Sequence, residues 1–214
     1  MNRKNVTSLF GFVALALSTS LSSVASAQQP PRYPSDFGAK GQISVNVDLP
    51  LTNDAPQLAI LNTSYTMGQD STTTVVIAPA LDYFVAPNIS IGGQLGYRHD
   101  SQTPAGSAIS FTGTGFIIGV RGGINIPLGS TLSFWPRLSL TYSSWTGGGY
   151  TDSAVPLAIF APLLWHPASH FFIGGGPVFA TELSHQSEAA GVSYAQPKRT
   201  DIGLQAIVGG YFGP

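Results

Sequence analysis

The sequence predicts an all-β protein in which one sheet of eight antiparallel strands closes into an up-and-down barrel. Three observations support this fold class. Apolar and polar residues alternate with a period of two along most of the chain after residue 41, which is typical of strands with two different faces. The alternating runs are even in number, and short connections between them alternate with longer ones. Only 9% of the 214 residues are charged, against about 25% in a typical soluble domain.

The first alternating run shows the pattern most clearly, because Ile43 and Val45 are interleaved with Ser44 and Asn46. Successive side chains of a strand point to opposite faces of the sheet, so each run has one apolar and one small or polar face. The sixth run is the least regular, since its second face is blurred. The eight predicted strands span residues 41–49, 72–85, 89–99, 109–126, 131–145, 154–165, 171–183 and 200–212.

Apolar residues occupy alternate positions in each predicted strand. The residues assigned to the apolar face are, in strand order, Ile43, Val45, Val47 and Leu49; Val75, Ile77, Leu81, Tyr83 and Val85; Ile89, Ile91, Leu95 and Tyr97; Phe116, Ile118, Val120, Ile124 and Ile126; Leu132, Phe134, Leu138, Leu140 and Tyr142; Val155, Leu157, Ile159, Leu163 and Trp165; Phe171, Ile173, Phe179 and Leu183; and Ile202, Leu204, Ala206, Val208 and Phe212.

The connections between the strands sort into two kinds by length. The short kind consists of the turns "APN", "PLGS" and "HPASH". The longer kind is polar and rich in Gly, Ser and Thr. Tight turns at one end and longer loops at the other are the plan of a barrel that crosses a membrane. The longer connections are expected at residues 50–71, 100–108, 146–153 and 184–198.

The apolar face is predicted to point outward into hydrocarbon. A sheet within a membrane has to close, because no backbone N–H or C=O group can stay unpaired there. The interior of an eight-stranded barrel is just wide enough for side chains to fill, which explains the small residues of the second face. Aromatic residues near strand ends suit the membrane interfaces. The residues assigned to these girdles are Tyr83, Phe84, Tyr97, Phe134, Tyr142, Trp165, Phe171, Tyr211 and Phe212.

Most charged residues of the strands share the face of the small polar residues. Charges in a low-dielectric interior must pair or bind trapped water. We expect them to form salt bridges that lock the lumen shut, and we favour this over transport because so narrow a barrel has no open channel. The expected members of this lumen charge network are Asp48, Asp82, Arg98, Arg121, Arg137, Glu182 and Asp201.

The N-terminus has the pattern of a secretory signal peptide. Arg3 and Lys4 precede an apolar run at residues 9–17, and the stretch from Ala25 to Ala27 is an A-x-A cleavage pattern. A polar, Pro-rich stretch follows, which is typical of an extended linker. The predicted organisation is a signal peptide at 1–27, a Pro-rich linker at 28–40 and the barrel at 41–212.

Composition argues against several kinds of site. The chain has no cysteine, so disulfides, zinc–thiolate sites and thiol nucleophiles are excluded. A formal net charge of −1 at pH 7 does not suggest a nucleic-acid partner. No histidine pair has the spacing of a metal site, and no glycine-rich loop leads into a helix that could hold a phosphate. We therefore expect neither a metal nor a cofactor.

Three stretches carry a family resemblance. "LDYFVAPNISIGGQLGY", "SFWPRLSLTYSSW" and "PLLWHPASHFFIGGGPVF" resemble bacterial small outer-membrane β-barrel proteins, and the resemblance covers most of the chain after residue 41. It implies a monomer in the outer membrane of a Gram-negative bacterium, with the termini and tight turns in the periplasm. The implied partners are outer-membrane lipid, lipopolysaccharide and the machinery that inserts barrels.

The resemblance leaves the activity open, because such barrels include adhesins, anchors, solute carriers and lipid-modifying enzymes. We expect a non-enzymatic structural or surface-interaction role. One alternative is a lipid-acting hydrolase, since the His-x-Ser spacing of His185 and Ser187 in "SHQSE" is similar to that of barrel deacylases, in which a histidine activates a nearby hydroxyl. Another is a secreted, soluble, lipocalin-like carrier, which would need the apolar face to turn inward.

Overall fold

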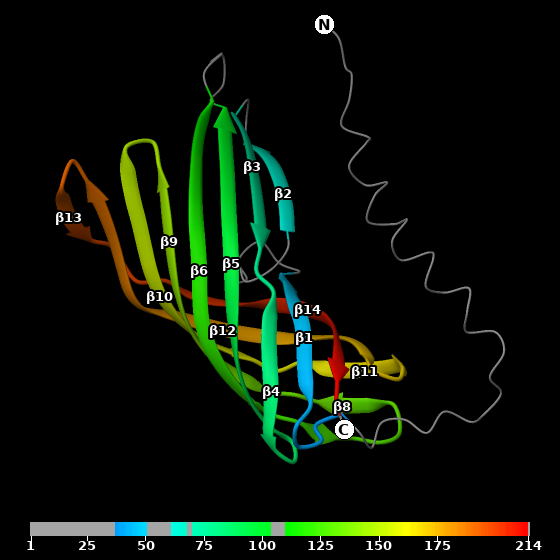
Figure 1. Cartoon of the computed structure of the whole chain (residues 1–214). Coiled ribbons are helices and arrows are strands. Elements are labelled where there is room, and N and C mark those ends of the chain that lie inside the picture. The colour runs from blue at the N-terminus through cyan, green and yellow to red at the C-terminus, as the bar shows by residue number, and fades with distance from the viewer. Residues whose placement is uncertain (1–36, 51–60, 68–69, 104–109, 214) are drawn as a thin grey trace, which may run out of the picture. The chain divides into compact units, whose positions relative to one another are not determined.

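A computed structural model of the protein describes residues 37–50, 61–67, 70–103 and 110–213. These residues form a closed, antiparallel barrel of eight strands, shown in Figure 1. Each of the eight consists of one or two segments and is called a wall below. The fold class predicted from the sequence, an all-β eight-stranded barrel, is confirmed. The predicted signal peptide and most of the predicted linker lie outside the described residues. Among the described residues, no helix is long and apolar enough to cross a membrane.

The eight walls contain fourteen strand segments. Their bounds are β1 Ile43–Pro50, β2 Leu61–Met67, β3 Asp70–Ile77, β4 Ala80–Ala86, β5 Ile89–Thr103, β6 Phe111–Ile124, β7 Ile126–Pro127, β8 Leu132–Phe134, β9 Arg137–Gly147, β10 Tyr150–Phe160, β11 Leu163–Ala168, β12 Phe171–Ala189, β13 Val192–Ala195 and β14 Thr200–Phe212.

Pairing around the barrel runs from β1 through β4, β5, β6, β9, β10, β12 and β14 and back to β1. The closing pair joins Ile43 to Phe212 and Pro50 to Gln205. The other segments lengthen these walls. For example, β3 and β4 both pair with β5, so together they form one wall. Closure removes the free edges that an open sheet of this size would expose.

Prolines explain why several walls are broken into two segments. Pro79 separates β3 from β4, Pro136 separates β8 from β9, and Pro162 separates β10 from β11. Proline has no N–H to donate to a neighbouring strand, so the ladder is interrupted at these positions. Three of the predicted strands therefore each comprise two segments without changing wall.

The two ends of the barrel differ. One end, the turn end, carries the tight turns between β4 and β5, between β7 and β8, and between β11 and β12, together with the start of β1 and the end of β14. The opposite end, the loop end, carries the end of β2, the start of β3 and the tips of the β9–β10 and β12–β13 hairpins (Figure 1).

The structure corrects the predicted long connections, because much of their length is paired strand. Residues 146–153 contain only a two-residue turn at Gly148 and Gly149, with φ of 61° and 85°. Glycine enters this left-handed region without steric cost, which suits a tight hairpin. Within residues 184–198, β12 continues to Ala189 and β13 pairs back onto it. These stretches were predicted as loops because their Ser and Gly residues lack apolar alternation.

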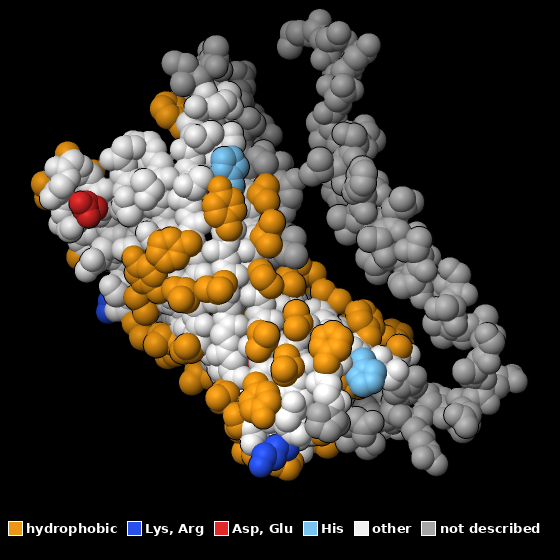
Figure 2. All heavy atoms as spheres, in the orientation of Figure 1, with side chains coloured by type: hydrophobic (Ala, Val, Ile, Leu, Met, Phe, Trp, Pro, Cys, Tyr) orange, Lys and Arg blue, Asp and Glu red, His pale blue; other side chains and the backbone are white. Residues whose placement is uncertain are grey.

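The barrel exposes its apolar face and buries its polar one. Leu95 and Val120 on the outside are 65% and 64% exposed, whereas Gln42 and Asp82 on the inside are 0% exposed. Figure 2 shows hydrophobic side chains spread over the visible outer wall with few charged side chains among them. This arrangement is the reverse of the one that a lipocalin-like carrier requires.

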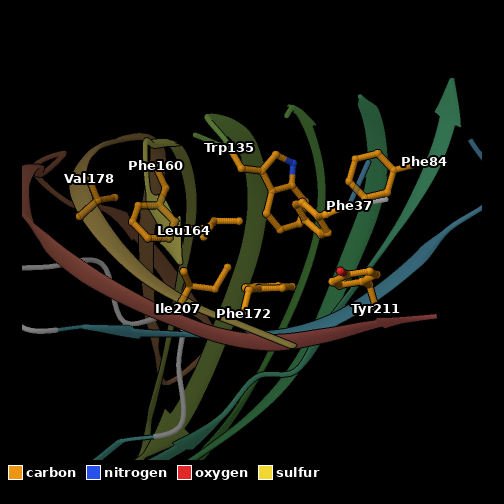
Figure 3. Packing of buried hydrophobic residues seen from close by; sticks show 9 residues of the cluster. All are labelled: Phe37, Phe84, Trp135, Phe160, Leu164, Phe172, Val178, Ile207 and Tyr211. Atoms are coloured by element: carbon orange, nitrogen blue, oxygen red, sulfur yellow. The ribbon is translucent and has the colours of Figure 1, made fainter. Parts of the chain in front are cut away.

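Aromatic and aliphatic side chains fill the lumen at the turn end, which corrects the prediction of a wholly polar interior. Phe84 and Tyr211 were predicted in the outer girdles, and this is wrong, because both point inward and are buried. Tyr83, by contrast, is exposed outside. Tyr83 and Phe84 are adjacent, so only one of them can face outward. The turn-end cluster (Figure 3) comprises Phe37, Phe84, Trp135, Phe160, Leu164, Phe172, Val178, Ile207 and Tyr211.

Phe37 joins this cluster from the segment that precedes β1. Its backbone carbonyl accepts a hydrogen bond from Asn125 Nδ2 at 2.9 Å. The next residue, Gly38, has a φ of 99° and donates its N–H to Gln42 Oε1 at 2.9 Å, while its carbonyl accepts the N–H of Asn88 at 2.7 Å. The packing of the barrel therefore begins inside the stretch predicted as linker.

Two glycines on opposite faces of β6 test the assignment of the faces. A Cβ at Gly119 would lie 2.9 Å from Thr141 Oγ1 and 3.3 Å from Gln94 Cγ inside the lumen. We expect Gly119→Leu to lower the free energy of unfolding by about 1–3 kcal/mol through overpacking. The matched control is Gly122→Leu, because a Cβ at Gly122 would make an ordinary contact, 3.5 Å from Ser90 O. Urea unfolding of the refolded barrels measures both, and equal losses would contradict the assignment.

Candidate functional site

A network of charged side chains occupies the lumen beside the turn-end cluster. Arg121 donates from Nε to Asp82 Oδ1 at 2.7 Å and from Nη2 to Asn46 Oδ1 at 2.7 Å, and Nη2 also contacts Asp82 Oδ2. Arg137 Nη2 donates to Asp48 Oδ1 at 2.6 Å, and Arg121 Nη1 lies 3.4 Å from Asp48 Oδ2. Asn46 completes the network by donating to Asp82 Oδ2 at 2.9 Å. We call these five residues the central network.

Strand register brings the members of the central network together. Gly92 on β5 pairs with Asp82 on one side and with Arg121 on the other. A Cβ at Gly92 would overlap the carboxylate of Asp82. The glycine therefore leaves the space in which an arginine from β6 reaches an aspartate from β4. Sequence reasoning did not single out this glycine, because its role depends on two neighbouring strands.

The central network balances two arginines against two aspartates in a site closed to water. All four side chains are at most 9% exposed. Removing such charges from water is costly, and their pairing and hydrogen bonds offset that cost. Arg137 also stacks over Trp135 and Phe160, with Cζ 4.6 and 5.0 Å from the ring centroids, which joins the network to the turn-end cluster.

Little space remains in the lumen at this level. A cavity lined by Asp48, Gln94, Arg121, Arg137 and other residues has a volume of only about 10 Å³. That is roughly the minimum for a single water molecule. The central network and the turn-end cluster together therefore fill this part of the barrel with side chains, as expected for eight strands.

The other three residues of the predicted lumen network lie elsewhere. Arg98 forms a separate pair with Asp100 at 2.6 Å, and Thr74 donates to the same carboxylate at 2.5 Å. Glu182 contacts His185 near the loop end. Asp201 is half-buried on β14. The structure thus brings four of the seven predicted residues into one network and leaves three outside it.

His185 and Ser187, the predicted hydrolase residues, meet at a carboxylate from a neighbouring strand. Asp152 on β10 accepts a hydrogen bond from Ser187 Oγ at 2.5 Å, and both of its oxygens lie 3.1 Å from His185 Nε2. On the other side of the ring, His185 Nδ1 lies 3.1 Å from Glu182 Oε2. We call Asp152, Glu182, His185 and Ser187 the acid–histidine cluster.

A bulge in β12 points three members of the acid–histidine cluster into the lumen. Across the β10–β12 pair, Val155 faces Ser184 and Pro156 faces Glu182, so Leu183 is an extra residue on β12. A bulge of this kind shifts the alternation of faces beyond it. Glu182 before the bulge and His185 and Ser187 after it consequently face the same way.

The acid–histidine cluster lacks the geometry of a Ser–His–Asp triad. In a triad, the histidine accepts the proton of the serine, and an acid orients the histidine from the other side. Here Ser187 donates to Asp152, and both nitrogens of His185 face carboxylates. Sequence reasoning missed Asp152 because it lies in a stretch predicted as loop. A hairpin recognised at Gly148 and Gly149 would have placed Asp152 on a strand, but its position opposite Ser187 depends on the register between β10 and β12.

Metal chemistry has no evident site in the part of the chain that the structure describes. No group of three or more His, Cys, Asp or Glu side chains there could hold a metal ion. In the acid–histidine cluster, each ring nitrogen already faces a carboxylate oxygen at 3.1 Å. Its arrangement is therefore that of a hydrogen-bonded cluster.

Comparisons with known proteins leave the family open. The chain matches no protein-family model and no curated protein sequence. The resemblance to outer-membrane β-barrel proteins therefore stays a prediction.

Proposed function

We propose that the protein is an outer-membrane β-barrel of a Gram-negative bacterium with a structural or surface-interaction role and no enzymatic activity. The single observation that supports this most strongly is the reversal of faces: branched aliphatic side chains cover the outside, and charged and amide side chains are buried inside. In water, so large an apolar surface would favour aggregation. In a membrane, hydrocarbon covers it, and closure of the sheet satisfies the backbone.

A structural role is favoured over transport because side chains fill the barrel. The turn-end cluster and the central network occupy the lumen in succession. A porin needs more strands to leave a water-filled channel. We infer that the barrel acts as an anchor, and that its loop end supplies the surface for interaction.

The proposed orientation follows from the two ends of the barrel. Tight turns belong on the periplasmic side and longer connections on the outside of such barrels. The start of β1 and the end of β14 share the turn end, so the chain would enter and leave from the periplasm. The β9–β10 and β12–β13 hairpins would then face the medium, next to the lipopolysaccharide leaflet. We further propose that the protein is monomeric, that insertion machinery places it in the membrane, and that the mature chain begins at Gln28 after export.

Fractionation of the cells that make the protein, combined with protease shaving, tests location and orientation together. We expect the mature protein in the outer-membrane fraction, with cleavage of intact cells confined to the loop end. The purified protein should need detergent and should change mobility on heating, as folded barrels do. N-terminal sequencing should give Gln28. Recovery in the aqueous phase without detergent would favour the lipocalin-like carrier instead.

Two arginine substitutions separate a lipid-facing wall from a water-facing one. Ile118 in the middle of β6 is 49% exposed, and Leu128 in the turn after β7 is 55% exposed. In a bilayer, Ile118→Arg should cost about 2–4 kcal/mol of the free energy of unfolding, and Leu128→Arg about 0–1 kcal/mol, because the penalty falls toward the interface. Urea unfolding in lipid vesicles measures both. Two small and equal costs would overturn the membrane proposal.

The contacts of the acid–histidine cluster do not favour a lipid-acting hydrolase, because Ser187 donates to Asp152 and not to His185. The protein incubated with lipopolysaccharide or phospholipid should release no fatty acid. Acyl release that disappears in His185→Ala would overturn the non-enzymatic proposal.

A further inference from the structure

The polar atoms that face the two ring nitrogens of His185 are all acceptors. Nε2 faces the two oxygens of Asp152, each at 3.1 Å. Nδ1 faces Glu182 Oε2 at 3.1 Å and the carbonyl oxygen of Pro197 at 3.3 Å. Ser187 gives its own proton to Asp152, so it adds no donor to the ring.

One proton held by the acid–histidine cluster would satisfy all of these contacts. A neutral imidazole carries one N–H and one lone pair, whereas the imidazolium donates from both nitrogens. With neutral His185 and ionised Asp152 and Glu182, one lone pair would point at a carboxylate oxygen. Moving the proton from His185 to a carboxyl group satisfies the same contacts, so the requirement is one proton for the cluster as a whole.

The cluster ties the connection between β13 and β14 to the barrel wall. The N–H of Arg199 donates to Glu182 Oε2 at 2.9 Å, and the N–H of Glu182 donates to the carbonyl of Arg199 at 2.9 Å. The N–H of Gln196 donates to the carbonyl of His185 at 2.9 Å. With the contact to Pro197, residues 196–199 are thus tied to β12 through Glu182 and His185.

Four other charged residues lie on β12, on β14 or in the connection between β13 and β14. Lys198 and Arg199 have exposed side chains, and Glu188 on β12 is exposed. Asp201 on β14 is half-buried and pairs with Ala180. The side chains that face His185 itself are Asp152 from β10 and Glu182 from β12.

We propose that the acid–histidine cluster is a proton-operated clasp, which holds residues 196–199 against β12 when it is protonated and releases them when it loses the proton. The bound proton stabilises the closed state, so closure is expected to weaken as pH rises from about 5 to 8. Imidazole is the side chain whose ordinary charge change lies between about pH 5 and 8. The clasp does not depend on what covers the outer wall. In the proposed orientation, the clasp would lie on the side of the external medium and would respond to the pH there.

Hydrogen exchange of the full-length protein refolded in detergent micelles tests the clasp. The reporter is the backbone amide of Arg199, followed from pH 5 to 8 and corrected for the intrinsic pH dependence of exchange. Its protection should fall by at least about tenfold as pH rises, because the amide loses its hydrogen bond to the carboxylate of Glu182. A hydrogen bond to a charged group is strong enough to account for a change of that size. The amide of Tyr211, which donates to the carbonyl of His170 at the turn end, is the internal control and should keep its protection.

Two variants and a matched control attribute the effect to the cluster. His185→Gln and Asp152→Asn should each abolish the pH dependence at Arg199, because neither leaves a ring between two carboxylates. His170→Asn removes a histidine at the opposite end of the barrel, at a left-handed φ of 63° that asparagine tolerates, and should leave the dependence intact.

Histidine nitrogen NMR gives an independent readout, because the His185 signals should show two protonated nitrogens at low pH. The proposal is overturned if Arg199 is equally protected at pH 5 and 8, or if the pH dependence survives in both cluster variants. Heat-modifiable mobility of each variant shows that the barrel has folded. A positive or negative result for the clasp is obtained whether or not the protein is found in the outer membrane.

Discussion

Replacing Arg121 with alanine is expected to lower the free energy of unfolding by about 3–5 kcal/mol. Arg121 is 2% exposed and contacts Asp82, which is 0% exposed, together with Asp48 and Asn46. Without the guanidinium, two aspartates would share one remaining arginine in a site closed to water. The cost comes from leaving a buried charge uncompensated, which exceeds the loss of an ordinary hydrogen bond. Urea unfolding of the refolded barrel, followed by tryptophan fluorescence, measures the change.

Arg98→Ala is the matched control. Arg98 also pairs with an aspartate, Asp100 at 2.6 Å, but its side chain is 38% exposed, so water can solvate what the substitution leaves. We expect a loss of about 0–1 kcal/mol there. Adding Asp82→Asn to Arg121→Ala should recover part of the stability, because it removes the orphaned charge. Equal losses in Arg121→Ala and Arg98→Ala would show that the central network is hydrated and does not seal the lumen.

The faces of the strands could be predicted from the sequence because alternation is a local property of extended backbone. Ile118 and Gly119 are neighbours, and the structure places them outside and inside, as predicted. The same alternation shows why the girdle assignment of Phe84 is wrong. Tyr83 faces outward with Leu81 and Val85, so Phe84 shares the inward face of Asp82, whose carboxylate binds Arg121 inside the lumen.

The sequence could predict which charged residues face the lumen, but it could not predict which of them contact each other. Asp48 and Arg137 are 89 residues apart and meet through the register of strands in between. That register depends on turns and on positions such as Gly92, whose missing side chain admits its neighbours. The sequence therefore indicated which charges face the lumen, but not that Arg98, Glu182 and Asp201 would lie outside the central network.

The residues that sequence reasoning missed lie in stretches without apolar alternation. Asp152 falls in a predicted loop that is a hairpin closed by Gly148 and Gly149. Phe37 falls in a predicted linker and is an isolated aromatic residue among polar ones. In both cases, long-range pairing or packing supplies the order that local composition does not indicate.

Phe37→Ala is expected to destabilise the barrel by about 3–5 kcal/mol, although Phe37 lies outside every strand. Its ring lies 5.1–5.3 Å from the rings of Phe84, Trp135, His166, Phe172 and Tyr211. Those side chains project from walls that are fixed by hydrogen bonds, so they have little freedom to collapse into the space left behind. A large residual cavity increases the cost of a truncation.

Phe212→Ala provides the comparison, because Phe212 is at the same end of the barrel but is 61% exposed on the outer wall. Its truncation should be much the smaller loss, since surrounding lipid or detergent can fill the gap. Urea unfolding of the two variants under the same conditions measures the difference. If the two losses were alike, Phe37 would not be docked inside the folded barrel. A large difference would show that the segment before β1 is a structural part of the barrel. The chain would then enter the barrel at the turn end, which is the arrangement that periplasmic termini require.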